Sequence, residues 1–143
     1  MIREFSAGGL VVRNMRGRPY VATVLVKDGT VHALPKGNIE DGEKAADAAL
    51  REVREETGLE AELLEKLGDV KYWYVRKWSD GERVFKVVSF FLFRYLSGSL
   101  RDYQAAEVDG AEWVPLEEAP KVLAYRGEKE MAKIALSKLR ESG

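Results

Sequence analysis

The sequence predicts an α+β fold, in which helices pack against a mixed β-sheet. Several segments rich in β-branched and aromatic residues alternate with Gly- or Asp-containing turns, which is typical of strands. Apolar residues recur at helical spacing in other segments. The chain has 143 residues, 45% of them hydrophobic and 33% charged, which is enough for one globular domain with a substantial core.

Strands dominate the expected order of elements. The turns NMRGR and Asp28-Gly29 separate the first three of these strands, and the turn SDGE joins the next two in a hairpin. The predicted strands are residues 5–13, 19–28, 30–34, 69–78, 83–96 and 111–116.

Three helices are expected between and after these strands. A loop over residues 35–43 leads into a helix over residues 43–57, which Gly58 should end. Residues 117–125 predict a short helix, and residues 128–141 predict a longer amphipathic one. We expect the last helix to serve packing only.

The composition excludes several classes of protein. The formal net charge of −1 argues against a generic polyanion binder, and the lack of cysteine excludes disulfides and thiolate metal sites. The first 20 residues lack an apolar core of signal-peptide length, and the apolar run at residues 87–93 is too short to span a bilayer. We therefore expect a single cytoplasmic domain over residues 1–143, with no membrane partner.

Three glutamates crowd one side of the helix predicted at residues 43–57. At about 100° per residue, Glu52, Glu55 and Glu56 lie beside its apolar stripe. Like charges at this spacing destabilise a helix by roughly 0.2–0.5 kcal/mol per pair. Close carboxylates suit a hard divalent cation such as Mg²⁺, which prefers oxygen ligands and shares its shell with substrate phosphates. The pattern predicts a metal site, and the ordinary alternative is a solvated helix face.

The spacing around this helix matches a known signature. From Gly37 to Leu59 the residues follow G-x5-E-x7-R-E-U-x-E-E-x-G-U, where U is a bulky apolar residue. Every defined position matches, so the chain resembles the Nudix (MutT-type) hydrolases over essentially its whole length. The resemblance implies an α/β/α sandwich around a mixed sheet. It also implies hydrolysis of a nucleoside diphosphate linked to some other group.

The resemblance implies roles for residues of this box, residues 37–59. Glu52, Glu55 and Glu56 would be catalytic residues that bind Mg²⁺ or Mn²⁺ together with the backbone carbonyl of Gly37. Arg51 would orient these carboxylates, although its spacing also allows a simple ion pair within the helix.

Two further glutamates fit the family pattern. Glu43, at the start of the helix, suits the positive end of the helix dipole and would support the loop geometry. In the distal segment QAAEVDGAEWVPL, Glu107 lies six residues before Trp113, as in the E-x5-W region of the family. Glu107 would be a further metal ligand and catalytic residue, with Glu112 as the alternative. Whether a box carboxylate or the distal one accepts the proton of water stays open.

The opening of the box indicates a substrate class. The segment LPKGNIEDGE resembles that of the bis(5′-nucleosyl)-tetraphosphate (asymmetrical) hydrolases, which split diadenosine tetraphosphate into ATP and AMP. The chain departs from this pattern at Asn38, where histidine is usual. Asparagine can still donate a hydrogen bond, but it cannot carry charge.

Four residues outside the metal ligands would bind this substrate. By the same resemblance, Lys86 would contact phosphate and Tyr72 or Tyr74 would stack on adenine. Lys36 would add a phosphate contact and Tyr125 a second stacking face. Each has an ordinary explanation as well, since tyrosines often pack in cores and lysines on strands often face solvent.

Other functions stay open at this point. Nudix enzymes of the same chemistry act on dNTPs or oxidised nucleotides, ADP-ribose, inositol pyrophosphates or RNA 5′ ends, the last usually with an opening like QFPQGG rather than ALPKGN. A non-catalytic nucleotide-binding module is the alternative from another class, but such modules typically lack box glutamates that this chain keeps. We expect a small nucleotide as partner, no stable nucleic-acid complex, and a monomer or homodimer.

Overall fold

The computed structural model of the chain describes residues 1–78 and 80–142. Within them one mixed sheet contains the strands β1 (Ile2–Met15), β2 (Arg18–Val26), β3 (Val31–Ala33), β4 (Lys36–Asn38), β5 (Leu59–Val75), β6 (Arg83–Gly98) and β7 (Gly110–Pro115). The helices are α1 (Ala45–Thr57), α2 (Ala119–Val122) and α3 (Arg126–Ser142), with a 3₁₀ turn η1 (Leu100–Asp102). None of these helices is long and apolar enough to cross a membrane.

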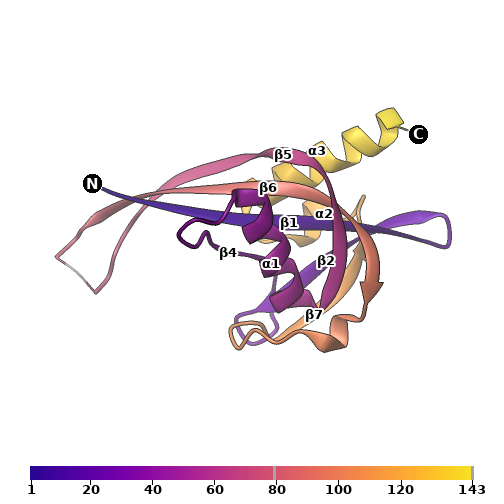
Figure 1. Cartoon of the computed structure of the whole chain (residues 1–143), viewed down its shortest axis with the longest axis horizontal. Coiled ribbons are helices and arrows are strands. Elements are labelled where there is room, and N and C mark those ends of the chain that lie inside the picture. The colour runs from indigo at the N-terminus through magenta and orange to yellow at the C-terminus, as the bar shows by residue number, and fades with distance from the viewer. Residues whose placement is uncertain (79, 143) are drawn as a thin grey trace.

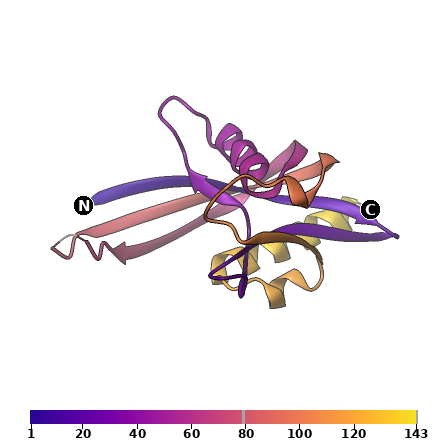
Figure 2. The same ribbon diagram turned by 90° about the horizontal axis from the view of Figure 1, so that it is seen from below.

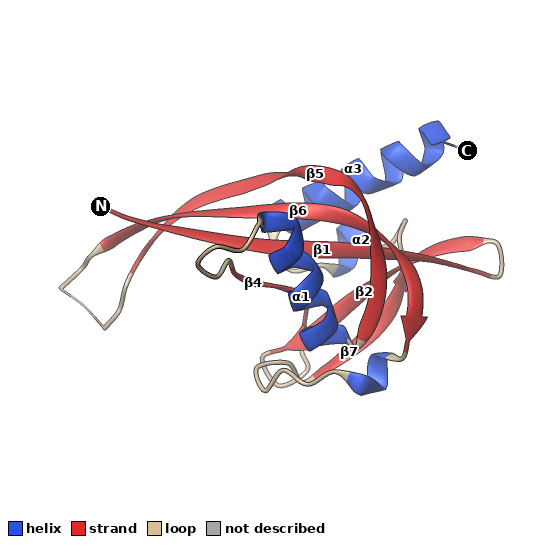
Figure 3. Ribbon diagram, viewed as in Figure 1, coloured by secondary structure: helices blue, strands red, loops and turns tan. Residues whose placement is uncertain are grey.

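The sheet has strand order β3-β2-β1-β6-β5, while β4 pairs with β1 and β7 pairs with β2. Strands β1 and β6 run parallel, and the other pairs are antiparallel. Figure 1 shows the long strands β1, β5 and β6 running side by side, and Figure 3 shows how the helices lie relative to them. The mixed sheet confirms the predicted α+β class.

Helices cover both faces of the sheet. Figure 2 shows α1 on one side and α2 and α3 on the other. Strand β1 serves both cores, because Leu10 and Val12 pack on the α3 side while Ala7 and Val11 pack on the α1 side. The strand is buried on both faces and therefore reads as a continuous apolar run. This arrangement confirms the α/β/α sandwich.

Strand β5 begins ten residues earlier than the sequence predicts. The segment LEAELLEKLG reads poorly as a strand because β5 lies at the edge of the sheet and exposes much of this stretch to solvent. Gly58 allows the chain to pass directly from α1 into β5. It ends α1 in the left-handed conformation, with φ of 75°, and its N–H donates to the carbonyl of Arg54. The hairpin of β5 and β6 is confirmed, whereas Ser79 of its predicted turn lies outside the described residues, as does Gly143.

The short strand β4 positions the box beside α1. It lies within a segment predicted as loop, and it pairs with residues 6–8 of β1. The N–H of Gly9 donates to the carbonyl of Pro35 at 3.0 Å, and the N–H of Ile39 donates to that of Phe5 at 3.0 Å. Gly8 allows this close approach, since a Cβ there would lie 2.7 Å from the Pro35 carbonyl oxygen.

Gly9 sets how closely α1 packs on the sheet. A Cβ at this position would lie 2.6 Å from Cγ2 of Val53 on α1 and 2.9 Å from the ring of Phe93. We predict that Gly9→Ala lowers the free energy of unfolding by about 1–3 kcal/mol, because both neighbours are fully buried and have little room to move. Chemical denaturation would measure this change.

Gly110→Ala is the matched control. Its added Cβ would lie 3.4 Å from Cδ1 of Leu25, which is an ordinary contact. Equal losses of stability in the two variants would contradict the close packing of α1 at Gly9.

Candidate active site

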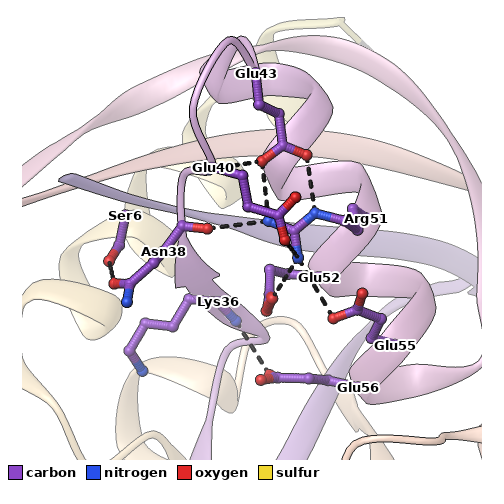
Figure 4. A network of polar contacts seen from close by, with 9 residues as sticks. All are labelled: Ser6, Lys36, Asn38, Glu40, Glu43, Arg51, Glu52, Glu55 and Glu56. Atoms are coloured by element: carbon purple, nitrogen blue, oxygen red, sulfur yellow. Dashed lines mark hydrogen bonds and ion pairs between the residues drawn. The ribbon is translucent and has the colours of Figure 1, made fainter.

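Arg51 is the centre of the polar network between α1 and the loop that precedes it. Its Nε and Nη2 donate to the two carboxylate oxygens of Glu43 at 2.8 and 2.9 Å, and Nη2 also donates to the carbonyl of Asn38 at 3.0 Å. Its Nη1 donates to Glu52 at 2.9 Å and to Glu55 at 3.4 Å (Figure 4). The guanidinium thus joins the loop to the carboxylates of the helix.

The loop is held by Glu43 as well. One oxygen of Glu43 accepts the N–H of Glu40 at 3.0 Å, which closes the loop before α1. The hydrogen bonds from Arg51, aided by this backbone N–H, lower the pKa of Glu43 to about 2. The same bonds raise the pKa of Arg51. Both groups are therefore charged at neutral pH.

Of the three glutamates predicted to bind metal from the helix, two are buried. Glu52 is 7% exposed and Glu56 is 6% exposed, whereas Glu55 lies in solvent. Burial, together with the nearby charges of Glu52 and Glu107, raises the pKa of Glu56 to about 8, although the N–H of Lys36 donates to it at 3.1 Å. Burial also raises the pKa of Glu52 despite its bond to Arg51. Protein groups alone compensate these carboxylates incompletely.

Gly37 provides the space for Glu52. A Cβ at position 37 would lie 2.2 Å from one carboxylate oxygen of Glu52 and 2.5 Å from the other. Any side chain at position 37 would displace the carboxylate. The carboxylate of Glu52 therefore packs directly against the backbone of β4.

The donor set fits a hard divalent cation. All candidate ligands are oxygens, and two of them belong to buried carboxylates whose pKa values are raised by burial. Among the described residues, however, no three acidic or histidine side chains already lie together as a metal site. Nη1 of Arg51 instead bonds to both Glu52 and Glu55, so a cation would have to draw these carboxylates from the guanidinium.

The distal loop lies against the end of α1. The N–H groups of Gln104 and Ala105 both donate to the carbonyl of Glu55, at 2.8 and 3.0 Å, and Val108 anchors the loop in the core. Glu107 is exposed on this loop and its charge acts on Glu56.

Glu112 points elsewhere. Strand β7 alternates, so that Trp113 packs with the core on the α1 side while Val114 packs on the α3 side with its partner Val21. Glu112 shares the face of Val114, and its carboxylate lies 3.8 Å from Nε2 of His32. Of the two candidates, the structure places Glu107 nearer the box.

A cavity of about 730 Å³ lies beside the start of the box, where Lys36 precedes Gly37. Lys36, Tyr72 and Tyr125 line it, so three of the four predicted substrate-binding residues come together. The Nζ of Lys36 lies 5.0 Å from the centre of the Tyr125 ring. Its backbone N–H donates to Glu56 of the box, and Lys36 also lines the cavity, so this residue contacts both.

Lys86, the fourth of these residues, lies next to the cavity but does not line it. It pairs with Tyr72 across β5 and β6, on the face that carries Val88 and Phe90, but it lies one step beyond the cavity lining. Tyr74, the alternative to Tyr72, lies outside the lining too, and its hydroxyl bonds to Glu4.

The sequence did not reveal Glu128 as part of the site. This residue is 3% exposed at the start of α3, accepts the Leu34 N–H at 2.7 Å and pairs with the Nζ of Lys36 at 2.6 Å. The expectation that the last helix serves packing only is therefore wrong. Its position three residues before Met131, on the apolar side of the helical pattern, was the available signal.

Comparisons with known proteins agree with this geometry. The family described as NUDIX domain matches residues 3–136. A protein of Mycobacterium tuberculosis named as mutator protein MutT4 is 42% identical over 152 residues, covering 99% of this chain and 59% of its own length. An RNA pyrophosphohydrolase of Novosphingobium aromaticivorans is 46% identical over 57 residues, covering 39% of this chain and 35% of its own length. The chain thus spans less than two thirds of the length of either relative.

A solved structure shares the fold. The Ap4A hydrolase of C. elegans superimposes with a TM-score of 0.70 at 20% identity, over 96% of this chain and 98% of that one. The family match covers nearly all of the chain, and the complete box lies where α1, β4 and the preceding loop meet. The chain therefore belongs to the Nudix hydrolase family.

Proposed function

We propose that the chain is a metal-dependent hydrolase of nucleoside polyphosphates, and that it cuts diadenosine tetraphosphate asymmetrically into ATP and AMP. One observation carries this proposal. Lys36 bonds through its backbone to Glu56 and lines, with its side chain, the cavity that holds Tyr72 and Tyr125. A polyphosphate at the box can thus extend its nucleoside into an adjoining pocket.

The box would hold the cation, Mg²⁺ or Mn²⁺. Its proposed ligands are Glu52, Glu55, Glu56 and Glu107, with the backbone carbonyl of Gly37. When bound, such an ion neutralises phosphate charge and lowers the pKa of a water molecule for attack on phosphorus. Arg51 orients two of the carboxylates, and the N–H of Lys36 orients Glu56. The proton acceptor is Glu56 or Glu107.

The cavity suits a nucleoside better than a bare phosphate. Its volume of about 730 Å³ is in the range of small-molecule sites. Tyr72 and Tyr125 are 41% and 39% exposed, so both rings are accessible for stacking. The lining combines apolar side chains with charges of both signs, including Lys71 and Asp69. Such a surface accommodates a base and a ribose.

RNA 5′-end hydrolysis is the second candidate. Several relatives carry the name RNA pyrophosphohydrolase, at 28–46% identity. The PKGN opening of this box differs from the usual opening in that group, and therefore favours the dinucleotide. For either substrate, we propose that one domain does this work in the cytoplasm, as a monomer or a homodimer.

A product assay tests the substrate. With Mg²⁺ and diadenosine tetraphosphate we expect ATP and AMP in equal amounts, and with Glu56→Gln a loss of kcat of roughly 100-fold or more, since a buried cation ligand is removed. Glu62→Gln, an exposed glutamate of β5, is the matched control and should retain full activity.

The same assay is run with dNTPs, ADP-ribose and 5′-triphosphate RNA. Turnover of one of these without cleavage of the dinucleotide would refute the proposed substrate but not the proposed metal site. Turnover that survives a chelator, or that Glu56→Gln leaves intact, would overturn the metal mechanism. A pH profile of Glu107→Gln that lacks the acidic limb of the wild type would identify the distal residue as the proton acceptor.

Stacking predicts a specific kinetic signature. Tyr125→Ala should raise KM for diadenosine tetraphosphate roughly 5- to 100-fold at unchanged kcat, because base–aromatic stacking contributes about 1–3 kcal/mol. Tyr125→Phe keeps the ring and should keep the KM. An unchanged KM in the alanine variant would show that the base binds elsewhere.

Burial of Glu56 predicts how the stability of the metal-free protein depends on pH. The folded state keeps the proton up to a pKa of about 8, whereas the unfolded state releases it near 4.5. The unfolded state is therefore increasingly favoured as the pH rises between these values, and stability falls by about 3 kcal/mol from pH 5 to pH 8. Denaturation in chelator should show this fall relative to Glu56→Gln.

The stabilisation of the protein by added Mg²⁺ provides a second test of the raised pKa of Glu56. A cation binds the ionised carboxylate, so Mg²⁺ should stabilise the wild type more at pH 8 than at pH 5. The same pH slope in wild type and Glu56→Gln would refute the assignment to this residue.

A further inference from the structure

The end of the sheet nearest the N-terminus extends beyond the helices. Figures 1 and 2 show the start of β1 and the hairpin of β5 and β6 projecting past α1 on one side and past α2 and α3 on the other. Both faces of the three strands are therefore free of helices at this end.

One of these faces continues the face that α1 covers. Ala7 and Val11 of β1 pack on the α1 side, so the alternation of side chains along the strand puts Arg3 and Phe5 on that side as well. The registers with β6 and β5 add their partners in cross-strand rows. We call this surface the outer face, and its residues are Arg3, Phe5, Lys71, Trp73, Val75, Arg83, Phe85 and Val87.

Aromatic side chains are exposed on the outer face. Trp73 is 48% exposed and Phe5 is 54% exposed. The ring of Trp73 lies 4.9 Å from that of Phe85, and the guanidinium of Arg83 lies 4.8 Å from the centre of the Trp73 ring. Exposed apolar side chains that lie together, rather than singly, mark interaction sites.

The charged residues of the outer face are all cations. They are Arg3, Lys71 and Arg83, and all three are exposed. None of them forms an ion pair with any residue within 1–78 and 80–142. The next cross-strand row toward α1 carries Asp69, but Ser89 and Lys66 already bond to its carboxylate, at 2.7 and 2.9 Å.

The opposite face of the same strands balances its charges internally. There, Arg76 lies 3.9 Å from a carboxylate oxygen of Glu4 and 3.3 Å from one of Glu82. The hydroxyl of Tyr74 also bonds to Glu4. On the outer face no such carboxylates accompany the cations, so charge complementarity indicates a partner that is an anion.

Single-stranded nucleic acid has both properties that this face requires. Its phosphates carry negative charge, and each unpaired base offers a flat surface that stacks on an aromatic side chain. Exposed aromatic residues on neighbouring strands of a sheet can bind two or three successive bases in this way. A second copy of the chain fits less well, because it would set three cations against three others.

We propose that the outer face is a binding site for single-stranded nucleic acid. Its rings stack on bases, and its cations contact phosphates. This departs from the expectation of no stable nucleic-acid complex, which followed from a net charge that averages over the whole chain. The proposal does not depend on the substrate of the box, because none of its residues belongs to the box. Lys71 also borders the first cavity, so the experiment uses Arg3 and Trp73, which do not.

Fluorescence anisotropy with a labelled RNA tests the proposal. The probe is a single strand of about 12 nucleotides with a 5′-hydroxyl end, titrated with the protein in chelator, which prevents hydrolysis. We expect saturable binding, whose Kd rises roughly 5-fold or more in Trp73→Ala, whereas Trp73→Phe keeps a ring and most of the affinity. Arg3→Gln should weaken binding and lower the slope of log Kd against log salt concentration by roughly 0.7.

Controls separate this face from the rest of the molecule. Leu96→Ala removes an exposed apolar side chain of β6, and Arg101→Gln removes an exposed cation of η1. Tyr125→Ala alters the first cavity. All three should leave the Kd unchanged. Trp73 and Arg3 are exposed, so their variants should keep the fold, which circular dichroism would verify. Duplex RNA of the same sequence should bind more weakly, because its bases are already stacked.

Several results would overturn the proposal. One is the absence of saturable binding, and another is binding that Trp73→Ala leaves intact or that Tyr125→Ala abolishes. Duplex RNA that binds as tightly as the single strand would show attraction of charge without stacking. Binding to vesicles of anionic lipid but not to RNA would assign the face to a membrane surface. A dimer in light scattering that Trp73→Ala separates would assign it to a second copy.

Discussion

The architecture of the box depends on one guanidinium. Arg51 bonds at once to Glu43 of the loop, to the carbonyl of Asn38 at the end of β4, and to Glu52 and Glu55 of α1. A lysine has one nitrogen and could not make these bonds together, whereas the planar fork of arginine presents five donors in fixed directions. The loop, the strand and the helix are therefore held in one geometry by a single side chain.

This geometry comes with an electrostatic cost. Glu52 and Glu56 are buried with fewer positive partners than their charges need, and their pKa values rise for that reason. Carboxylates whose ionised form is disfavoured in a folded protein are typical of sites that bind a cation or transfer a proton. Ionising these two carboxylates therefore costs the folded protein stability in the absence of a cation.

Lys36 connects the chemistry of the box to the choice of substrate. Its backbone belongs to the sheet edge beside α1, and its side chain reaches the face covered by α3, where Glu128 holds it. The two faces of the sandwich thus meet at the short strand β4. The close approach of β4 to β1 requires glycine at position 8. The position of the Glu52 carboxylate against β4 requires glycine at position 37.

The sequence predicted some elements well and others poorly. Helix α1 was predictable from its apolar spacing and from Gly58, and β1 and β6 from their long apolar runs. The first ten residues of β5 were not, because an edge strand exposed to solvent lacks a clear period of two. The strand β4 was also missed, since three residues with glycine at the centre carry no strand pattern and pair only because β1 offers them a free edge.

The sequence alone determined the residue types and spacing of the box, and with them the family, since nine positions at fixed intervals depend on local helix geometry. It also indicated Lys36, Tyr72 and Tyr125, but not that they share a cavity. Only the tertiary structure decided that Glu128 reaches Lys36 across 92 positions and that Lys36, Tyr72 and Tyr125 line one cavity. These relations depend on the order of strands in the sheet and on how α3 packs over it, which local patterns do not specify.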